Sequence, residues 1–357
     1  MAAFFDKVST VDEINKPISS DNSMTSRERV RATLIFATPD RVPRDLWALP
    51  YVSLFKKNEL DDLLNRFPMD FGRPELSPGS NDRDLQKLVR PGSYVDEWGS
   101  VWHLAEPGII GEVKEPALAE WSRLGTFRPP WEFVRSRDWD SVNRECERSD
   151  LFMLSDVCAR PFERLQFLRG TENLYIDLAY DTAELRTLID MVHQFYLEEV
   201  TSWAKSNVDA VALMDDWGSN TSLLISPTLW RTVFKPMYKE YCDAIHAGGK
   251  FVFFHSDGNI EAIYGDLIEI GVDALNSQLF CMDIERLSAK HKGKITFWGE
   301  VDRQHVLPYG TTGDVKAAVG RVRKALYDPR GGVIAQCEWG KDNTRKNVEA
   351  VFEAWDE

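Results

Sequence analysis

The 357-residue sequence lacks long apolar runs and any excess of positive charge. No stretch reaches the length of a transmembrane helix, and the opening MAAFFDKVSTVDEINK has neither a basic start nor the apolar segment of a secretory signal. Lys and Arg number 43 against 57 Asp and Glu, so the net charge is −14. An acidic surface repels nucleic-acid phosphate and anionic lipid. The composition therefore predicts a cytoplasmic protein that binds neither nucleic acid nor membranes.

Cysteine is scarce and scattered. The five residues are Cys146, Cys158, Cys242, Cys281 and Cys337. This odd, widely spaced set is not the disulfide framework of a small secreted protein, so each cysteine is inert core, a metal ligand or a nucleophile. The glycine signatures G-x-G-x-x-G after a first strand and G-x-x-x-x-G-K-[ST] are also missing. Nothing therefore predicts dinucleotide or P-loop nucleotide chemistry.

What the sequence does contain is a regular alternation of apolar, strand-like runs and helical segments. The clearest strand-like runs are VDAVALMDDWG, KFVFFHSDG, VDALNSQ, KITFWGEVD and GGVIAQCEWG, from residue 208 onward. Strands that are apolar throughout and separated by helices predict a parallel sheet covered by helices. We predict an α/β fold, a single (β/α)8 TIM barrel over residues 24–357, with a hairpin-like excursion near residues 90–125. Residues 1–23 are expected to form a loosely attached extension, and an open doubly wound sheet is the alternative architecture.

Polar residues stand where several of these strands are predicted to end. They include Asp215, Asp216, His255, Asp257, Asn276, Gln278, Glu300, Cys337 and Glu338. In a closed barrel the carboxyl ends of all strands meet on one face, where active sites lie. Imidazole, thiolate and carboxylate are also the ligands of catalytic zinc, which keeps one position open. The same residues are equally compatible with a hydrogen-bonded strand-end histidine and a buried, inert cysteine.

Two further features suggest a substrate site at this face. Asp215 and Asp216 are adjacent, so only one of them is expected to face the barrel interior, as a general acid or base; the alternative for each is a capping or loop acceptor. Twelve tryptophans are more than a core usually needs. We expect Trp47, Trp217, Trp298 and Trp339 to wall a pocket, with ordinary core packing as the alternative.

Several segments together resemble the uroporphyrinogen decarboxylase superfamily, from about Met24 to the end of the chain. They are MTSRERVRATLIFATPDRVP, LYIDLAYDTAELRTLID, DDWGSNTSLLISPTLWRTVFKPMYKEYCDAIHAGGKFVFFHSDGNI, FWGEVDRQHVLPYGTTGDVKAAVGRV and KNVEAVFEAW. The resemblance implies a single TIM barrel, in agreement with the alternation above, and often a homodimer. The superfamily contains metal-free decarboxylases of haem biosynthesis and zinc methyltransferases that work with corrinoid proteins.

The match to the decarboxylase branch is incomplete. Its members carry an R-Q-A-G-R-Y type segment whose arginines bind the carboxylates of the tetrapyrrole. Here 41-RVPRDLWALPYVSLF-55 retains only Arg44 and Tyr51, and Asp70 in FPMDFG is the counterpart of the catalytic aspartate. Because guanidinium groups are the natural receptors for several carboxylates, their loss argues against a tetra-acid substrate.

The methyltransferase branch agrees better. Its members hold zinc with a His-x-Cys at one strand end and a second cysteine near the last strand. The resemblance assigns these positions to His255, Asp257 and Cys337, with Asp257 in place of the first cysteine and Glu338 as a spare ligand or base. The corrinoid-binding signature D-x-H-x-x-G is absent, and 243-DAIHAGG-249 misses it by one residue, so cobalamin would come on a separate corrinoid protein.

The resulting hypothesis is a zinc-dependent, methyltransferase-like enzyme that demethylates a small methoxylated or methylated compound, with the methyl group passed to or from a corrinoid or thiol. The predicted metal ligands are His255, Asp257 and Cys337, and the predicted catalytic residues are Asp215, Asp216 and Glu338. The predicted substrate-binding residues are Trp47, Asp70, Trp217, Asn276, Gln278, Trp298, Glu300 and Trp339. One alternative is a metal-free decarboxylase of a small carboxylate, which would need Arg44, Arg73 and Arg303 at the barrel mouth. The other is a barrel that binds a small ligand without chemistry, with His255 hydrogen-bonded into the core.

Overall fold

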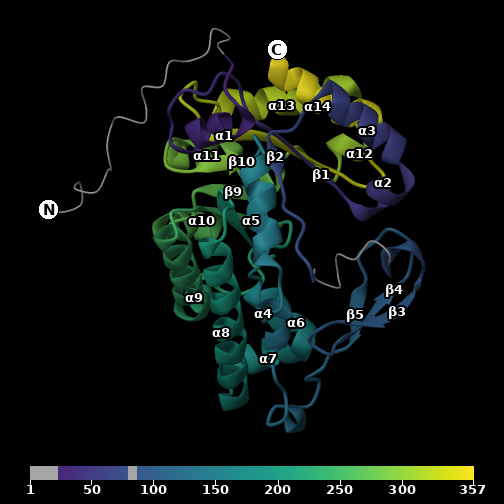
Figure 1. The fold of residues 1–357 in the computed structure, drawn as a ribbon, viewed down its shortest axis with the longest axis vertical. Coiled ribbons are helices and arrows are strands. Elements are labelled where there is room, and N and C mark those ends of the chain that lie inside the picture. The colour runs from purple at the N-terminus through teal and green to yellow at the C-terminus, as the bar shows by residue number, and fades with distance from the viewer. Residues whose placement is uncertain (1–22, 79–86) are drawn as a thin grey trace, which may run out of the picture.

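The computed structural model describes residues 23–78 and 87–357, so all but the last residue of the predicted N-terminal extension lies outside the described part. Eight parallel strands form a nearly closed barrel in the order β1-β11-β10-β9-β8-β7-β6-β2 (Figure 1). They are β1 (Arg44–Ala48), β2 (Phe71–Gly72), β6 (Phe152–Val157), β7 (Ala210–Met214), β8 (Phe251–Ser256), β9 (Ala274–Ser277), β10 (Thr296–Trp298) and β11 (Val333–Trp339). At the remaining seam the backbone N–H of Asp70 donates to the carbonyl of Arg44 at 2.9 Å. The predicted TIM barrel is confirmed.

Side chains of the barrel strands alternate between two hydrophobic clusters. Inside the barrel lie Phe71, Phe152, Leu154, Phe253, Trp298 and Ile334. Between the barrel and its helices lie Val211, Val252, Phe254, Ala335 and Cys337, among others. Both faces of each strand are therefore buried, which explains why the strand sequences are apolar throughout instead of alternating.

Helices cover the outside of the barrel and follow most of its strands (Figure 1). The longer ones are α1 (Ser26–Leu34), α3 (Lys57–Arg66), α5 (Trp139–Arg148), α6 (Pro161–Arg169), α7 (Thr171–Tyr180), α8 (Ala183–Lys205), α9 (Pro227–Ala247), α10 (Glu261–Ile270), α11 (Ile284–His291), α13 (Thr312–Leu326) and α14 (Arg345–Asp356). The shorter ones are α2 (Pro50–Phe55), α4 (Trp131–Arg135) and α12 (Val306–Tyr309). Several begin with a side-chain cap, as α1 does at Thr25, where Glu28 completes a capping box.

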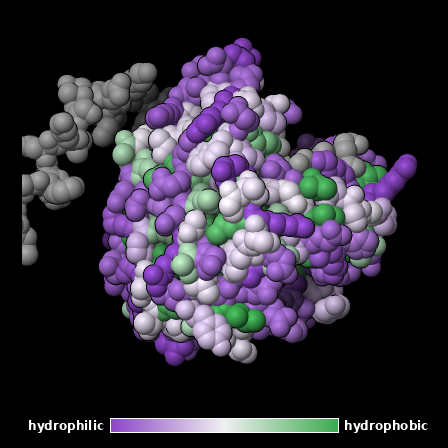
Figure 2. All heavy atoms as spheres, turned by 90° about the horizontal axis from the view of Figure 1, so that it is seen from below, coloured by the Kyte–Doolittle hydropathy of each residue, from purple (hydrophilic) through white to green (hydrophobic). Residues whose placement is uncertain are grey.

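The surface is largely polar. On the face shown in Figure 2, hydrophilic residues predominate and hydrophobic ones lie in small separate groups. Within the described part of the chain, no helix combines the length and apolarity needed to cross a bilayer.

The predicted excursion is a three-stranded antiparallel sheet beside the barrel, formed by β3 (Gly92–Val95), β4 (Val101–Leu104) and β5 (Glu112–Glu115) (Figure 1). It is held to α6 by a buried ion pair, in which Nη1 of Arg164 lies 3.0 Å from Oδ2 of Asp96. The hydroxyl of Ser100 also donates to the carbonyl of Phe167 at 3.0 Å. The excursion is thus a packed part of the domain.

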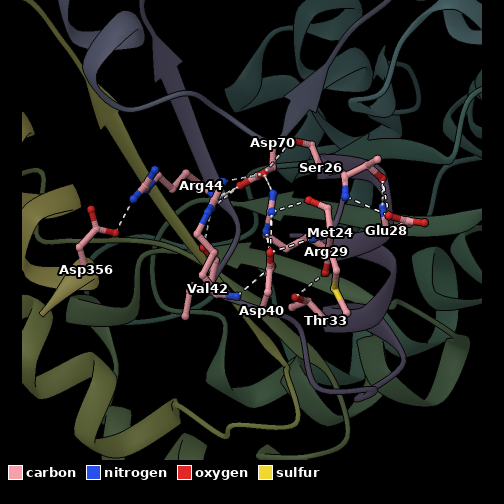
Figure 3. Close-up of polar contacts among 12 residues, drawn as sticks. Met24, Ser26, Glu28, Arg29, Thr33, Asp40, Val42, Arg44, Asp70 and Asp356 are labelled. Carbon is pink, nitrogen blue, oxygen red and sulfur yellow. Dashed lines mark hydrogen bonds and ion pairs between the residues drawn. The ribbon is translucent and has the colours of Figure 1, made fainter. Parts of the chain in front are cut away.

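Asp70 lies at the amino-terminal end of the barrel, opposite the face where the strands end (Figure 3). Its carboxylate is fully buried and pairs with Arg29 at 2.6 Å and Arg41 at 2.7 Å. It also accepts from the backbone N–H of Arg44 at 2.7 Å and the hydroxyl of Ser26 at 2.9 Å. Asp70 directly precedes β2, which runs from it toward the mouth, so its carboxylate lies at the far end of the barrel and is paired with groups of the protein itself. The predicted substrate-binding role of Asp70 is therefore corrected to a structural one.

Candidate metal-binding site at the barrel mouth

Three potential metal ligands converge where β7 and β8 end. Asp216 follows β7, His255 lies near the end of β8, and Asp257 follows β8 directly. One ligand atom from each residue lies within 4.8 Å of the other two. Nε2 of His255 is 3.3 Å from Oδ1 of Asp257 and 3.6 Å from Oδ1 of Asp216. We call this group the Asp–His–Asp triad; its nitrogen and oxygen donors are suited to a divalent cation.

The orientation of the His255 ring is fixed by Asn276, on β9. The amide nitrogen of Asn276 donates to the carbonyl of Trp298 at 2.5 Å and to Oε1 of Gln336 at 3.1 Å. Its amide oxygen must therefore face Nδ1 of His255, 2.6 Å away, and Nδ1 carries the proton. Nε2 is left pointing at the two carboxylates, as in histidines that bind metals. Asn276 is fully buried, so its predicted contact with substrate is corrected to the positioning of His255.

Electrostatics in the triad favour a cation. Burial opposes protonation of His255, but the nearby carboxylates of Asp257 and Asp216 raise its pKa to about 10. Burial likewise opposes ionisation of Asp257, yet His255 and Arg303 hold the pKa of this carboxyl well below its usual range. Without a metal, a proton on Nε2 therefore supplies the positive charge that a bound ion would supply in its place.

A second acidic group surrounds Arg303, which follows β10. Its guanidinium group contacts the Asp257 carboxylate, and Nη1 lies 2.9 Å from Oε2 of Glu338. Nε is 3.8 Å from Oε2 of Glu300. Burial raises the pKa of Glu300 to about 8 against the attraction of Arg303. The structure thus brings the predicted residues Glu300 and Glu338 to the triad, together with an arginine considered earlier only for decarboxylation.

Glu163 is a member of the site that the sequence analysis missed. It lies in the first turn of α6, and burial, with the charge of Asp216, raises its pKa to about 7. Its Oε2 atom is buried and receives no hydrogen bond from the described residues. The signal was available, because α6 begins soon after β6 ends, which places a carboxylate of 158-CARPFERL-165 at the mouth.

Asp215 points away from the site. Its fully buried carboxylate accepts the backbone N–H of Phe162 at 2.7 Å, that of Glu163 at 2.8 Å, and the hydroxyl of Tyr238. These bonds satisfy amide groups in the first turn of α6, where no side chain of the helix itself provides a cap. Of the two adjacent aspartates only Asp216 therefore faces the site, and the predicted catalytic role of Asp215 is corrected to a structural one.

The side chain of Cys337 also points away from the site, toward the helices that cover the barrel. It is fully buried in the cluster between barrel and helices, with Ala335 and Trp339, whereas Ile334 on the same strand packs inside the barrel. Burial raises the pKa of the Cys337 thiol. Glu338, one residue further, faces the mouth instead. The predicted metal ligand Cys337 is therefore corrected: Asp216 is the third member of the triad.

The four tryptophans predicted to wall a pocket lie in three different places. Trp217 stacks on Phe162 with ring centres 4.2 Å apart in the outer layer, and Trp339 lies in the same layer; neither reaches the mouth. Trp298 fills the barrel interior. Only Trp47 is half-buried at the mouth, 5.0 Å from the ring of His255 and 5.1 Å from that of Trp298 beneath it.

Gln278 completes the site. It is buried, and its Oε1 atom accepts the backbone N–H of Gly258 at 2.9 Å. With Cys281, Glu300 and Arg303 it lines a small pocket next to the triad. Gln278 and Glu300 thus keep positions from which a substrate can be contacted.

Comparison with known proteins places this geometry in a family. The family model described as uroporphyrinogen decarboxylase (URO-D) matches residues 155–357, more than half of the chain. No curated protein matches the chain. A solved methyltransferase from Methanosarcina mazei is 15% identical, with a TM-score of 0.71 over 94% of this chain and 99% of that chain. Two xylanases are matched less well: the glycosylated endo-β-1,4-xylanase of Gloeophyllum trabeum (11% identity, TM-score 0.47, covering 90% and 98% of the two chains) and xylanase 10B of Thermotoga maritima (9%, 0.46, 93% and 98%).

The methyltransferase shares the barrel over nearly the full length of both chains. The family match covers every strand from β7 to β11, and with them the triad, Glu300 and Glu338. The chain therefore belongs to the uroporphyrinogen decarboxylase (URO-D) family.

Proposed function

We propose that this protein is a metal-dependent, methyltransferase-like enzyme that removes the methyl group of a small methoxylated or methylated compound. The observation that carries the proposal is the Asp–His–Asp triad at the carboxyl ends of the strands, the face where TIM barrels place their active sites. The residues fit a cation. Oδ1 of Asp257 is buried and accepts no hydrogen bond of normal geometry, although Nε2 of His255 lies near it.

The donor set favours an ion that accepts oxygen ligands. Zinc binds two carboxylates and an imidazole, and so do other divalent ions that prefer oxygen, such as Mn²⁺. With Cys337 on the far side of β11, no thiolate of the described residues joins the triad. We propose zinc or such an ion, held by Asp216, His255 and Asp257.

The surrounding residues support demethylation of an ether. A bound divalent ion would act as a Lewis acid on the oxygen that carries the methyl group. As the carbon–oxygen bond breaks, its electron pair stays on oxygen, and the alkoxide needs a proton. Glu163 and Glu300, with pKa values raised to about 7 and about 8, hold such protons near neutral pH. We propose that the methyl group passes to a corrinoid on a separate protein or to a thiol.

Metal content tests the proposal directly. Protein purified without a histidine tag, as wild type, Asp216→Asn, His255→Ala and Cys337→Ser, would be loaded with zinc or manganese, desalted and measured by plasma mass spectrometry. We expect close to one metal per chain in the wild type and in Cys337→Ser, and loss of metal in the other two variants. Circular dichroism would show that each variant is folded. A wild type without metal, or a loss confined to Cys337→Ser, would contradict the proposal.

The arrangement of arginines gives no comparable support to a metal-free decarboxylase. Arg44 bonds to Asp356 at the amino-terminal end of the barrel (Figure 3). Arg303 is at the mouth, but its guanidinium group is already engaged by carboxylates. Arg73 follows β2 at the mouth, and its Nη2 atom is 3.9 Å from Oδ2 of Asp45. A carboxylate substrate would therefore meet an acidic surface whose arginines already lie beside carboxylates of the chain.

A further inference from the structure

We infer that the methylated substrate is polyhydroxylated, of the sugar or polyol class, and that its hydroxyl groups form hydrogen bonds with buried carboxyl groups beside the triad. That the substrate carries a methyl group rests on the proposed function. That it carries hydroxyl groups is inferred separately, from the polar groups at the barrel mouth.

The first observation is that two carboxyl oxygens beside the triad are buried and have no hydrogen-bond partner in the part of the chain that the structure describes. Oε1 of Glu300 and Oε2 of Glu163 are buried and receive no hydrogen bond from the described residues, and Glu300 as a whole is only 3% exposed. Buried polar atoms are nearly always hydrogen-bonded in native proteins, because an unpaired one costs free energy. These two atoms therefore need a hydrogen-bond partner from outside the described residues, and a ligand hydroxyl, which both donates and accepts, can pair with either form of a carboxyl group.

The second observation is the composition of the rim. Next to Glu300, the small pocket is lined by the amides of Gln278 and Gln304, and Nε2 of Gln304 donates to Oδ1 of Asn220 at 2.9 Å. Amide groups both donate and accept, as hydroxyl groups do. Trp47 adds a half-buried ring at the mouth, against which the C–H face of a sugar ring can pack.

Charge and hydrogen bonding together distinguish a hydroxylated ligand from a cationic, an anionic or an apolar one. A quaternary ammonium ligand would be attracted by the carboxylates, but it has no N–H group and would leave the buried oxygens without a hydrogen-bond partner. An anionic ligand would be repelled by the carboxylates, and an apolar one would leave their oxygens without donors. A neutral ligand rich in hydroxyl groups avoids all three costs. The carboxylates concerned are Glu163, Asp216, Asp257, Glu300 and Glu338.

Binding of matched methoxy compounds tests the inference without any methyl transfer. The probes are a panel of mono-O-methyl hexoses and pentoses, methoxyacetate as anion, (2-methoxyethyl)trimethylammonium as cation and methoxybenzene as apolar probe. Saturation-transfer NMR would identify binders and calorimetry would measure their affinity, with and without added zinc or manganese. Wild type, Glu300→Ala and Trp47→Leu would be compared with Glu269→Ala, a matched change at an exposed position of α10.

We expect members of the sugar panel to bind and both mouth variants to weaken them about tenfold or more. Glu300→Ala removes a hydrogen-bond partner worth about that factor, and Trp47→Leu removes the ring against which the sugar packs. Glu269→Ala should bind as the wild type does. Preferred binding of a charged or apolar probe, or sugar affinity unchanged in both mouth variants, would overturn the inference. If Glu300→Ala does not fold, Trp47→Leu decides. Metal uptake without sugar binding would refute this inference and leave the proposed function standing; sugar binding without metal uptake would do the reverse.

Discussion

Replacing Asn276 should weaken metal binding without touching a metal ligand. The Asn276 amide makes three hydrogen bonds in a fully buried site, to Nδ1 of His255, the carbonyl of Trp298 and Oε1 of Gln336. Partners that orient a ligating histidine are typically worth about 10–100-fold in metal affinity, or roughly 1.4–2.7 kcal/mol. We expect a loss of this size in Asn276→Ala. Its three former partners are also left unsatisfied at about 1–3 kcal/mol each, so the free energy of unfolding should fall by about 3 kcal/mol or more.

A second variant separates orientation of the ring from general loss of stability. Asn276→Asp keeps an oxygen facing Nδ1 of His255, but its second oxygen then faces the carbonyl of Trp298 and Oε1 of Gln336, which are both acceptors. This variant should lose stability yet keep most of its metal affinity. Calorimetric metal titration and urea unfolding of the metal-free proteins measure the two quantities. Wild-type affinity in Asn276→Ala, or equal losses of affinity in both variants, would refute the positioning role.

Three further changes test the structural assignments, each by urea unfolding with metal content as a second readout. Asp215→Ala leaves the first-turn amides of α6 and the Tyr238 hydroxyl unpaired, so we expect a loss of about 3 kcal/mol with metal retained; loss of metal from a folded variant would show that Asp215 belongs to the site. Asp70→Asn leaves Arg29 with one fewer carboxylate in a buried cluster and should cost about 3 kcal/mol, again with metal retained; an unchanged unfolding midpoint would contradict this. Asp273 raises the pKa of His246, so the pair stabilises the fold fully below the unfolded pKa of about 6.5 and loses this effect as pH rises through the folded pKa. His246→Gln should therefore be more destabilising at about pH 5.5 than at about pH 8.5, and an equal effect at both would reject the pair as the cause.

The sequence predicted the fold well because strand and helix signals repeat with the same spacing through most of the chain. Apolar runs such as 251-FVFFHS-256 are buried on both faces, and this requires helices over a closed or doubly covered sheet. The polar ends of these runs also located the mouth correctly, since His255, Asp257, Glu300 and Glu338 all lie there. Asp70 was misplaced because β2 has only two residues, too few for the sequence to show which end of the strand the aspartate occupies.

The errors within the site have one physical origin, which is the phase of the strands. Side chains alternate between the faces of a strand, so a shift of one residue exchanges the barrel interior for the helix layer. Where one face is solvated, hydropathy reveals this phase. On β11 all residues but Glu338 are buried, so hydropathy could not show whether Cys337 or Glu338 faces the mouth. The same ambiguity applied to Asp215 and Asp216, and the structure resolves both pairs in favour of the second residue.

Resolving the phase changes the chemistry expected of the site. A site with Cys337 as ligand would have been suited to soft partners, including the sulfur of a thiol. The triad instead offers two carboxylates and one imidazole, with Glu300 and Glu338 nearby, and such a site prefers oxygen. Among the methylated compounds considered, an ether oxygen is the better match, and the protons held near neutral pH by Glu163 and Glu300 would suit a leaving alkoxide. The position of one cysteine, on the helix side of β11, thus favours the methoxylated compounds among the substrates that the sequence suggested.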